Sequence, residues 1–161
     1  MNIATFGAGC FWSVENAFRQ IRGVRSTSVG YMGGHFPHPS YLDVLARITG
    51  HAEVVQIAYN PDEVSYDRLL DVFWQVHDPT QLNRQGPDRG EQYRSVIFYH
   101  DRQQEETARR SKRMLQQSRQ FDREIVTQIQ PAGAYYLADE SHQQYLEKLE
   151  KQRKQGKQGK Q

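Results

Sequence analysis

Hydrophobic residues recur in two different spacings along the chain, and these spacings alternate. Short runs of β-branched and aromatic residues, ended by glycine or proline, predict strands, whereas apolar residues three or four positions apart predict amphipathic helices. In the first hundred residues, strands are predicted at Asn2–Ala8, Val24–Met32, Glu53–Tyr59 and Arg94–His100, and helices at Cys10–Gln20 and Ser65–His77.

The second part of the chain continues the alternation with more polar segments. A polar helix is predicted at Asp101–Gln120, a strand at Glu124–Gln130 and a last helix at Ser141–Lys154, while a short helix capped by Ser40 is predicted to reach Ala46. The first six long elements follow the order β-α-β-β-α-β. This order predicts an α+β fold, a two-layer sandwich with a split βαβ (ferredoxin-like) mixed sheet and helices. The long polar segment 78–92 interrupts it, and long loops in compact domains are more often functional than not.

Charge is distributed unevenly over the 161 residues. The formal net charge is +2, but five of the 21 Lys and Arg and none of the 19 Asp and Glu lie in residues 151–161, so residues 1–150 are mildly acidic. A Lys, Gln and Gly run without apolar residues cannot bury surface, so we expect a single domain at 1–150 and a basic, disordered tail at 151–161. The domain offers no excess of basic residues for nucleic-acid binding, so we expect no specific nucleic-acid partner.

The chain contains a single cysteine, Cys10. One thiol excludes an intramolecular disulfide and any zinc site with several thiolates, and the six histidines are scattered, so we expect no metal site. Low cysteine content favours a cytoplasmic location. We find no secretory signal pattern and no apolar run near 18 residues, so we expect no membrane association.

Cys10 stands where the first strand ends and the first helix begins. Unpaired backbone N–H groups at a helix N-terminus favour a negative charge, which predicts a stabilised thiolate. Gly7 and Gly9 would let a substrate approach the sulfur, and Phe11 and Trp12 would place flat apolar walls beside it. The pattern predicts a nucleophile facing a small apolar group, although a buried structural cysteine fits the same position equally well.

A nucleophile that attacks an oxidised or carbonyl centre also needs a proton donor for the leaving oxygen. Glu53 precedes the apolar run VVQIAY, where burial would favour the neutral carboxylic acid. The pattern alone leaves open an ordinary solvent-facing glutamate at a strand end. The string DRGEQYR at 88–94 also places acid and phenol groups directly before a strand, which is a weak signal by itself.

Five strings occur in a fixed order along the chain: GCFW at 9–12, GYMGG at 30–34, TGHAEVV at 49–55, DRGEQYRS at 88–95 and HQQYLEK at 142–148. Together they resemble the peptide methionine sulfoxide reductase A family. The resemblance covers about residues 2–150, which it implies to be a single catalytic domain.

The reaction implied by the resemblance is a thiol-dependent reduction of methionine-S-sulfoxide, free or within proteins, to methionine, and thus protein repair after oxidative damage. Cys10 matches the nucleophile that attacks the sulfoxide sulfur and becomes a sulfenic acid. Glu53 matches the acid that protonates the sulfoxide oxygen.

Five further positions match residues of the family's substrate pocket. Tyr41 and Tyr93 match phenols that help to bind the sulfoxide oxygen. Phe11 and Trp12 match the apolar wall that holds the S-methyl group, and Asp88 matches a supporting polar residue of the same pocket.

The chain departs from the commonest family pattern in its cysteines. Many members carry further cysteines that close a disulfide onto the sulfenic acid, but none follows Cys10 here; Leu45 stands where cysteine is frequent and His38 where asparagine is usual. We therefore expect an external thiol reductant, namely thioredoxin, glutaredoxin or a small thiol, and no metal or organic cofactor. The expected partners are oxidised proteins or free methionine sulfoxide and that reductant, with the enzyme a monomer.

Two other classes of function are compatible with parts of the sequence. A peroxide-reactive protein or redox sensor could use the same activated thiolate, but a peroxide needs no methyl-sized pocket or proton-donating Glu53. A binding module could contact nucleic acid through aromatic residues and the basic tail, and such binding would weaken strongly with salt.

Overall fold

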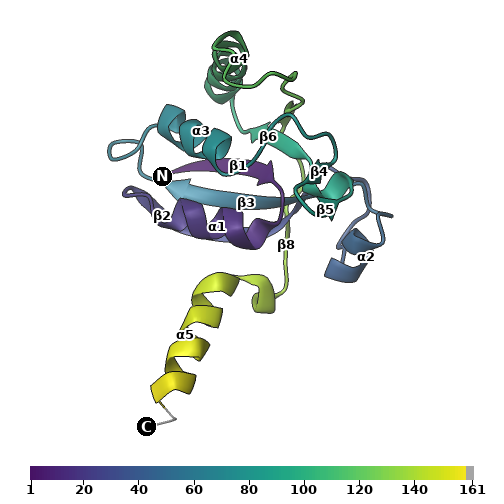
Figure 1. The fold of residues 1–161 in the computed structure, drawn as a ribbon, viewed down its shortest axis with the longest axis vertical. Coiled ribbons are helices and arrows are strands. Elements are labelled where there is room, and N and C mark those ends of the chain that lie inside the picture. The colour runs from purple at the N-terminus through teal and green to yellow at the C-terminus, as the bar shows by residue number, and fades with distance from the viewer. Residues whose placement is uncertain (159–161) are drawn as a thin grey trace.

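A six-stranded mixed sheet forms the centre of the protein in a computed structural model, which describes residues 1–158 (Figure 1). The strand order is β7-β6-β1-β3-β2-β8, and a separate hairpin pairs β4 with β5. The strands are β1 (Asn2–Ala8), β2 (Val24–Met32), β3 (Ala52–Tyr59), β4 (Arg84–Gln85), β5 (Asp88–Arg89), β6 (Ser95–Tyr99), β7 (Gln128–Pro131) and β8 (Tyr136–Leu137).

Helices cover one face of this sheet. The α-helices are α1 (Phe11–Arg19), α2 (Tyr41–Leu45), α3 (Tyr66–Gln75), α4 (Arg102–Gln117) and α5 (Tyr145–Gln158), and two 3₁₀ turns span Glu91–Tyr93 and Glu140–His142. Buried residues of α1, α3 and α4 share one hydrophobic cluster with the inner face of β1, β3 and β6. Figure 1 shows α1 lying across the sheet, with α3 beside it and α4 beyond α3.

The strand connections confirm the predicted fold class. β1 and β2 each pair antiparallel with β3, which lies between them, so the β1-α1-β2 unit is a split βαβ. β6 pairs antiparallel with β1 on the side away from β3. β1 therefore lies between β3 and β6, and the β3-α3-β6 unit is a second split βαβ. The added edge strand β7 runs parallel to β6, and this makes the sheet mixed.

Side-chain caps explain where three helices begin. The Ser40 hydroxyl accepts the Asp43 N–H and the Asp43 carboxylate accepts the Ser40 N–H, a capping box that starts the predicted short helix α2. Ser65 caps α3 and Asp101 caps α4 in the same manner. These helices therefore begin one residue after the polar residue that the sequence placed at their start.

The strand predicted at Glu124–Gln130 begins later than expected, at Gln128. The backbone N–H of Ile125 donates instead to the Gln116 side chain, and that of Val126 donates to the Pro79 carbonyl. Because these partners lie outside the sheet, the first residues of the segment cannot join the β6 ladder.

The C-terminal helix also differs from the prediction. The chain forms a 3₁₀ turn at 140–142 where the helix was expected to begin, and α5 then runs to Gln158. Residues 151–158, which we expected to be disordered, are therefore helical, and residues 159–161 lie outside the described residues. Strong helix formers such as Lys, Gln and Arg extend a helix that is already nucleated. The division into a domain at 1–150 and a tail stays a prediction.

Polar side chains attach the segment before α5 to the rest of the protein. The Gln143 amide accepts the Val29 N–H at 2.8 Å and donates to the Val29 and Ala138 carbonyls. The buried carboxylate of Glu15 on α1 accepts hydrogen bonds from the Gln144 backbone and side chain. The C-terminal segment is thereby fixed across α1.

Within residues 1–158 no helix has both the length and the apolar character needed to cross a bilayer.

Replacing Gln143 by alanine should lower the free energy of unfolding by about 2 kcal/mol, because the buried N–H of Val29 loses its acceptor. Gln155→Ala, at an exposed position of α5, is the matched control. Urea unfolding of the two variants checks the prediction, and equal losses in both would contradict it.

Candidate active site

The junction of β1 and α1 places Cys10 at the N-cap of α1, where its thiol is partly exposed. Gly9 has a φ of +98°, which a side chain would strain, so the sharp turn into the helix requires glycine. We expected Gly7 and Gly9 to leave room for a substrate, but the structure shows that they do not. A Cβ at Gly7 would meet Val96 and one at Gly9 would meet Gln85, so both spaces are filled by protein.

The Cys10 thiol is not stabilised as a thiolate in the free protein, which corrects the prediction from its helix position. Burial raises its pKa to about 11; the Trp12 and Ser13 N–H groups lower it, and the negative charges of Glu53 and Asp88 raise it. The amides of the helix terminus act in the predicted direction, but desolvation and the nearby carboxylates outweigh them.

The Glu53 side chain is 1% exposed, which excludes the solvent-facing alternative. Its Oε1 accepts the backbone N–H of Phe11 at 3.2 Å, and its Oε2 has no hydrogen-bond partner among residues 1–158. Burial raises the pKa of this carboxyl to about 8, the Phe11 N–H lowers it, and Asp88 raises it. The neutral acid is therefore the main form at neutral pH, as the sequence predicted.

Aromatic rings form a wall beside the thiol. Phe11 is buried and Trp12 is half-buried, and both rings lie nearly parallel to the ring of Tyr41, at 6.4 and 6.5 Å between centres. His142 and Tyr145 from the C-terminal segment complete this aromatic wall: the Trp12 Nε1–H donates to His142 Nδ1, and the Tyr145 ring stacks 4.0 Å from Trp12.

Tyr93 and Asp88 come from the long polar loop at 78–92 and the turn that follows it. The pKa of Tyr93 is raised to about 12, mainly because the phenol is buried. The negative charges of Glu53, Tyr41, Asp88 and Cys10 in their ionised forms contribute in the same direction. Burial and the same carboxyl groups raise the pKa of Tyr41. These phenols are therefore protonated hydrogen-bond donors at neutral pH.

Two sets of hydrogen bonds hold this loop above Cys10. The Gln85 amide accepts the Asp78 N–H at 2.9 Å and donates to the Asp78 carbonyl, which closes the loop at its base. Arg47, just after α2, donates to the Arg89 carbonyl at 2.8 Å. The loop that carries Asp88 is thus connected to the helix that carries Tyr41.

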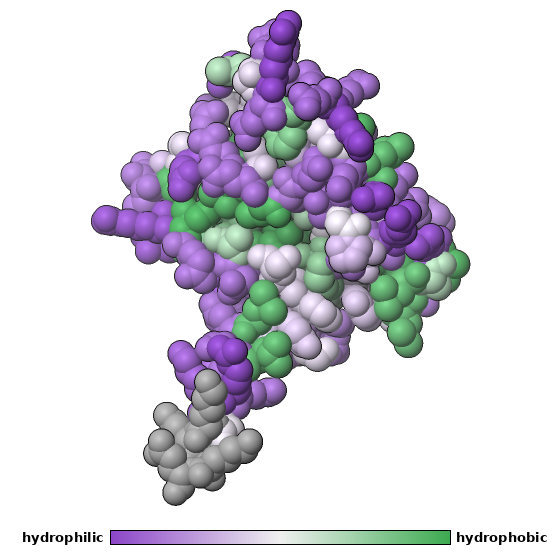
Figure 2. Space-filling view, viewed as in Figure 1, coloured by the Kyte–Doolittle hydropathy of each residue, from purple (hydrophilic) through white to green (hydrophobic). Residues whose placement is uncertain are grey.

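The surface beside the site includes exposed apolar side chains around α2. Leu42 is 74% exposed and Ile48 is 53% exposed, while Leu45, at the position where the family often has cysteine, is exposed to a smaller degree. Figure 2 shows a green, hydrophobic patch where Figure 1 places α2, whereas the surface over α4 is largely hydrophilic.

The structure brings all seven predicted site residues to one end of the sheet, although their catalytic roles stay predictions. Sequence reasoning missed Tyr31, His142 and Tyr145. The last two lie in the string at 142–148, but their contacts with Trp12 depend on how the C-terminal segment crosses α1. Among residues 1–158 we find no group of three or more His, Cys, Asp or Glu side chains able to hold a metal ion.

Comparisons with known proteins agree on one family. Residues 2–161 match the family described as peptide methionine sulfoxide reductase. The chain is 68% identical over 148 residues to peptide methionine sulfoxide reductase MsrA 1 of Nostoc sp., covering 92% of this chain and 91% of the relative. It is 63% identical over 145 residues to MsrA of Methanothermobacter thermautotrophicus, covering 90% and 86%.

Solved structures show the same similarity. Reduced Mxr1 from Saccharomyces cerevisiae superposes with a TM-score of 0.86 at 36% identity, covering 91% of this chain and 84% of the yeast chain. Methionine sulfoxide reductase A of Corynebacterium diphtheriae superposes with a TM-score of 0.80 at 37% identity, covering 91% and 74%.

Alkylation of Cys10 by iodoacetamide should be slow at neutral pH and still accelerate above about pH 10, because only the thiolate reacts. Since the chain has one cysteine, mass spectrometry of the cysteine peptide reports on this thiol alone. A midpoint at the ordinary thiol value of 9.0 would contradict the expected desolvation.

Glu53→Gln should shift this alkylation curve to lower pH, because it removes one of the negative charges that raise the thiol pKa. Glu124→Gln, which neutralises an exposed carboxylate outside the site, is the control and should leave the curve in place.

Proposed function

The chain belongs to the peptide methionine sulfoxide reductase family and reduces methionine sulfoxide through a thiol, and we propose how its own residues carry out this reaction. The observation that carries the proposal is the buried, neutral carboxyl of Glu53, whose Oε2 has no hydrogen-bond partner among residues 1–158, beside the partly exposed Cys10 and the aromatic wall. The substrate is the S epimer of methionine sulfoxide, free or within proteins.

The aromatic wall is proposed to orient the sulfoxide. The half-buried ring of Trp12, packed beside the buried ring of Phe11, is an apolar surface suited to the S-methyl group, and the hydroxyl groups of Tyr41 and Tyr93 are donors for the sulfoxide oxygen. Asp88 supports the same pocket from β5. With the methyl group against the rings and the oxygen toward the phenols, the sulfur faces Cys10.

Oxygen transfer then needs a proton on the leaving oxygen. Glu53 donates its proton to the sulfoxide oxygen while the Cys10 sulfur attacks the sulfoxide sulfur, and the carboxylate takes up the thiol proton. The attack forms a bond between the two sulfur atoms. The protonated oxygen then moves to the Cys10 sulfur, so that an S–O bond forms there while the substrate S–O bond and the sulfur–sulfur bond break. The products are methionine, reduced by two electrons, and a Cys10 sulfenic acid that retains the proton.

The protonation states support this route. The pKa values of Glu53 and Cys10 are raised to about 8 and about 11, so both groups carry their protons at neutral pH. A thiol is a poor nucleophile, and the carboxylate left by proton transfer supplies the base that it needs. The nucleophile is therefore activated as the oxygen is protonated.

Regeneration is proposed to use an external thiol, because no second cysteine exists to form a disulfide with Cys10. The solved complex of yeast Mxr1 with Trx2, whose Mxr1 chain has 26% identity to this one, supports a protein thiol of the thioredoxin type. A lone thiol that must return to its reduced state fits a reducing compartment such as the cytoplasm. The seven site residues of one copy gather at one end of its sheet, so no second copy is needed to complete the site, and we propose a monomeric enzyme.

Without reductant, the protein should form at most one methionine per chain from methionine-S-sulfoxide and gain one oxygen at its single Cys10. With dithiothreitol the S epimer should turn over repeatedly and the R epimer should not. Amino-acid analysis and intact mass measure both results. If neither epimer is reduced, the proposed reaction is wrong. Oxidation of Cys10 by peroxide but not by methionine sulfoxide would favour a peroxide-reactive thiol.

Glu53→Gln should slow the single-turnover reaction by about 100-fold, the lower range for general acid catalysis. In the wild-type protein the rate should fall as pH rises through about 8, because the carboxyl with the raised pKa then loses the proton it must donate. Rapid-quench measurements across pH test this, and the decline should be absent in Glu53→Gln. A decline at the same pH in both proteins would assign it to another group.

A further inference from the structure

Tyr31 on β2 is a buried residue that the proposed mechanism does not use. Its side chain is 1% exposed, and its hydroxyl has no hydrogen-bond partner among the described residues. Its ring packs against Phe11, with 5.7 Å between ring centres. A buried hydroxyl without a partner destabilises a fold and is uncommon, so its presence beside a reactive site requires an explanation.

The residue directly opposite Tyr31 in the pairing of β2 with β3 is Glu53. Opposed residues on antiparallel strands have their side chains on the same face of the sheet as close neighbours. Phe11 contacts both: its ring packs on Tyr31 and its N–H donates to Glu53 Oε1. A hydroxyl donor and the acceptor Oε2, both without partners in the described part of the chain, therefore lie on neighbouring strands as close neighbours.

The proton transfer explains why such a donor is needed. While Glu53 is protonated, its carboxyl is neutral and an unpartnered Oε2 is tolerated. Between the transfer of its proton to the sulfoxide oxygen and the uptake of the thiol proton, Glu53 is a buried carboxylate. Among residues 1–158 this carboxylate has one hydrogen bond, from the Phe11 N–H to Oε1. A buried carboxylate is strongly destabilised unless further donors reach it, and hydrogen bonds to charged groups are the strong ones.

We propose that Tyr31 is a positioning residue whose hydroxyl donates to Glu53 Oε2, directly or through one water, when that carboxyl is ionised. The proposal rests on the proposed function of Glu53 and adds a group to which neither the mechanism nor the resemblance assigns a role. Burial, and next the charge of Glu53, raise the pKa of Tyr31 far above its ordinary value. The phenol therefore keeps its proton throughout the reaction, so it can donate a hydrogen bond but does not act as a second proton donor to the substrate.

The other titratable groups near this pair come from several elements. The charge of Asp88 on β5 raises the pKa of Glu53. The groups that raise the pKa of Tyr31 by their charge, besides Glu53, are Tyr41, Asp139 and Tyr135. None of them supplies a hydrogen bond to Oε2 in the described residues. Within residues 1–158, Tyr31 is the one residue that lies directly opposite Glu53 on a paired strand and has a buried hydroxyl without a hydrogen-bond partner.

Tyr31→Phe removes only this hydroxyl. The single-turnover rate should fall about tenfold, and the pKa of Glu53 should rise by about one unit, because the ionised carboxyl loses a donor. Accordingly, the decline of the rate at high pH should move to higher pH. Rapid-quench kinetics and the ¹³C NMR signal of the labelled Glu53 carboxyl measure the two effects independently.

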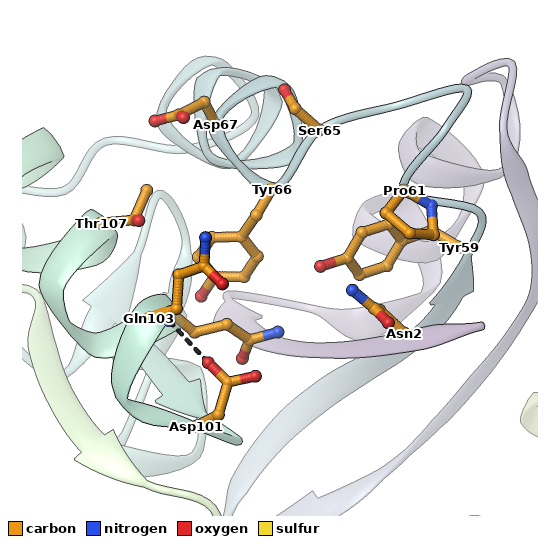
Figure 3. Close-up of a pocket in the computed structure, with 10 residues that line it drawn as sticks. Asn2, Tyr59, Pro61, Ser65, Tyr66, Asp67, Asp101, Gln103 and Thr107 are labelled. Atoms are coloured by element: carbon orange, nitrogen blue, oxygen red, sulfur yellow. Dashed lines mark hydrogen bonds between the residues drawn. The ribbon is translucent and has the colours of Figure 1, made fainter.

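Tyr66→Phe is the matched control. Among residues 1–158 the Tyr66 hydroxyl is also buried without a hydrogen-bond partner. Tyr66 begins α3 and lines a cavity with Asn2 of β1, at the end of the sheet away from Cys10. Figure 3 shows Tyr66 in a cavity of about 270 Å³ that Asn2, Tyr59 and Asp101 also line. This variant should leave both the rate and the pKa of Glu53 unchanged.

A double-mutant cycle separates the proposed role from a packing role. In the Glu53→Gln background, Tyr31→Phe should have no further effect on the rate, since glutamine never becomes a carboxylate. A tenfold loss in both backgrounds, or an unshifted pKa of Glu53 in Tyr31→Phe, would overturn the proposal while Glu53 keeps its role. Absence of sulfoxide reduction by the wild-type protein would instead overturn the proposed function.

Discussion

Burial of the Glu53 carboxyl beneath the first turn of α1 is the constraint on which the candidate site depends. β3 lies between β1 and β2, so a side chain on its inner face is shielded from water by the helix that begins at Phe11. Desolvation at that place favours the neutral acid, and a neutral acid is what the leaving oxygen requires. One position in the sheet thereby determines the proton donor and the electrostatic surroundings of Cys10.

The same burial keeps the two reacting groups, the Glu53 carboxyl and the Cys10 thiol, protonated at neutral pH in the free protein. The N-terminus of α1 favours a thiolate, yet desolvation and two carboxyl groups hold the pKa of Cys10 above its ordinary value. In the proposed mechanism, the thiol becomes a strong nucleophile only when a polar S–O bond accepts the proton of Glu53. The reactivity of Cys10 therefore depends on a bound sulfoxide. Reagents that cannot accept the proton of Glu53 should react slowly with this cysteine.

Segments far apart in the chain complete the pocket. The Gln143 and Gln144 side chains fix the C-terminal segment to β2 and to Glu15 of α1, and this places His142 against Trp12. The loop at 78–92 reaches the thiol from another direction. The shape of the pocket therefore depends on directional hydrogen bonds, made by polar side chains with the backbone and with one another, together with the stacking of Tyr145 on Trp12.

The sequence by itself predicted the order of the longer strands and helices and the split βαβ topology, but not the β4–β5 hairpin or β8. Short strings such as GCFW contained six of the seven site residues. Periodicity and caps are local, so Ser40, Ser65 and Asp101 marked helix starts correctly. Only the tertiary structure decided the protonation of Cys10, because desolvation depends on what covers the sulfur. Tertiary structure alone also paired Tyr31 with Glu53 and closed Gly7 and Gly9 against neighbouring side chains, since strand register and long-range contacts leave no local trace in the sequence.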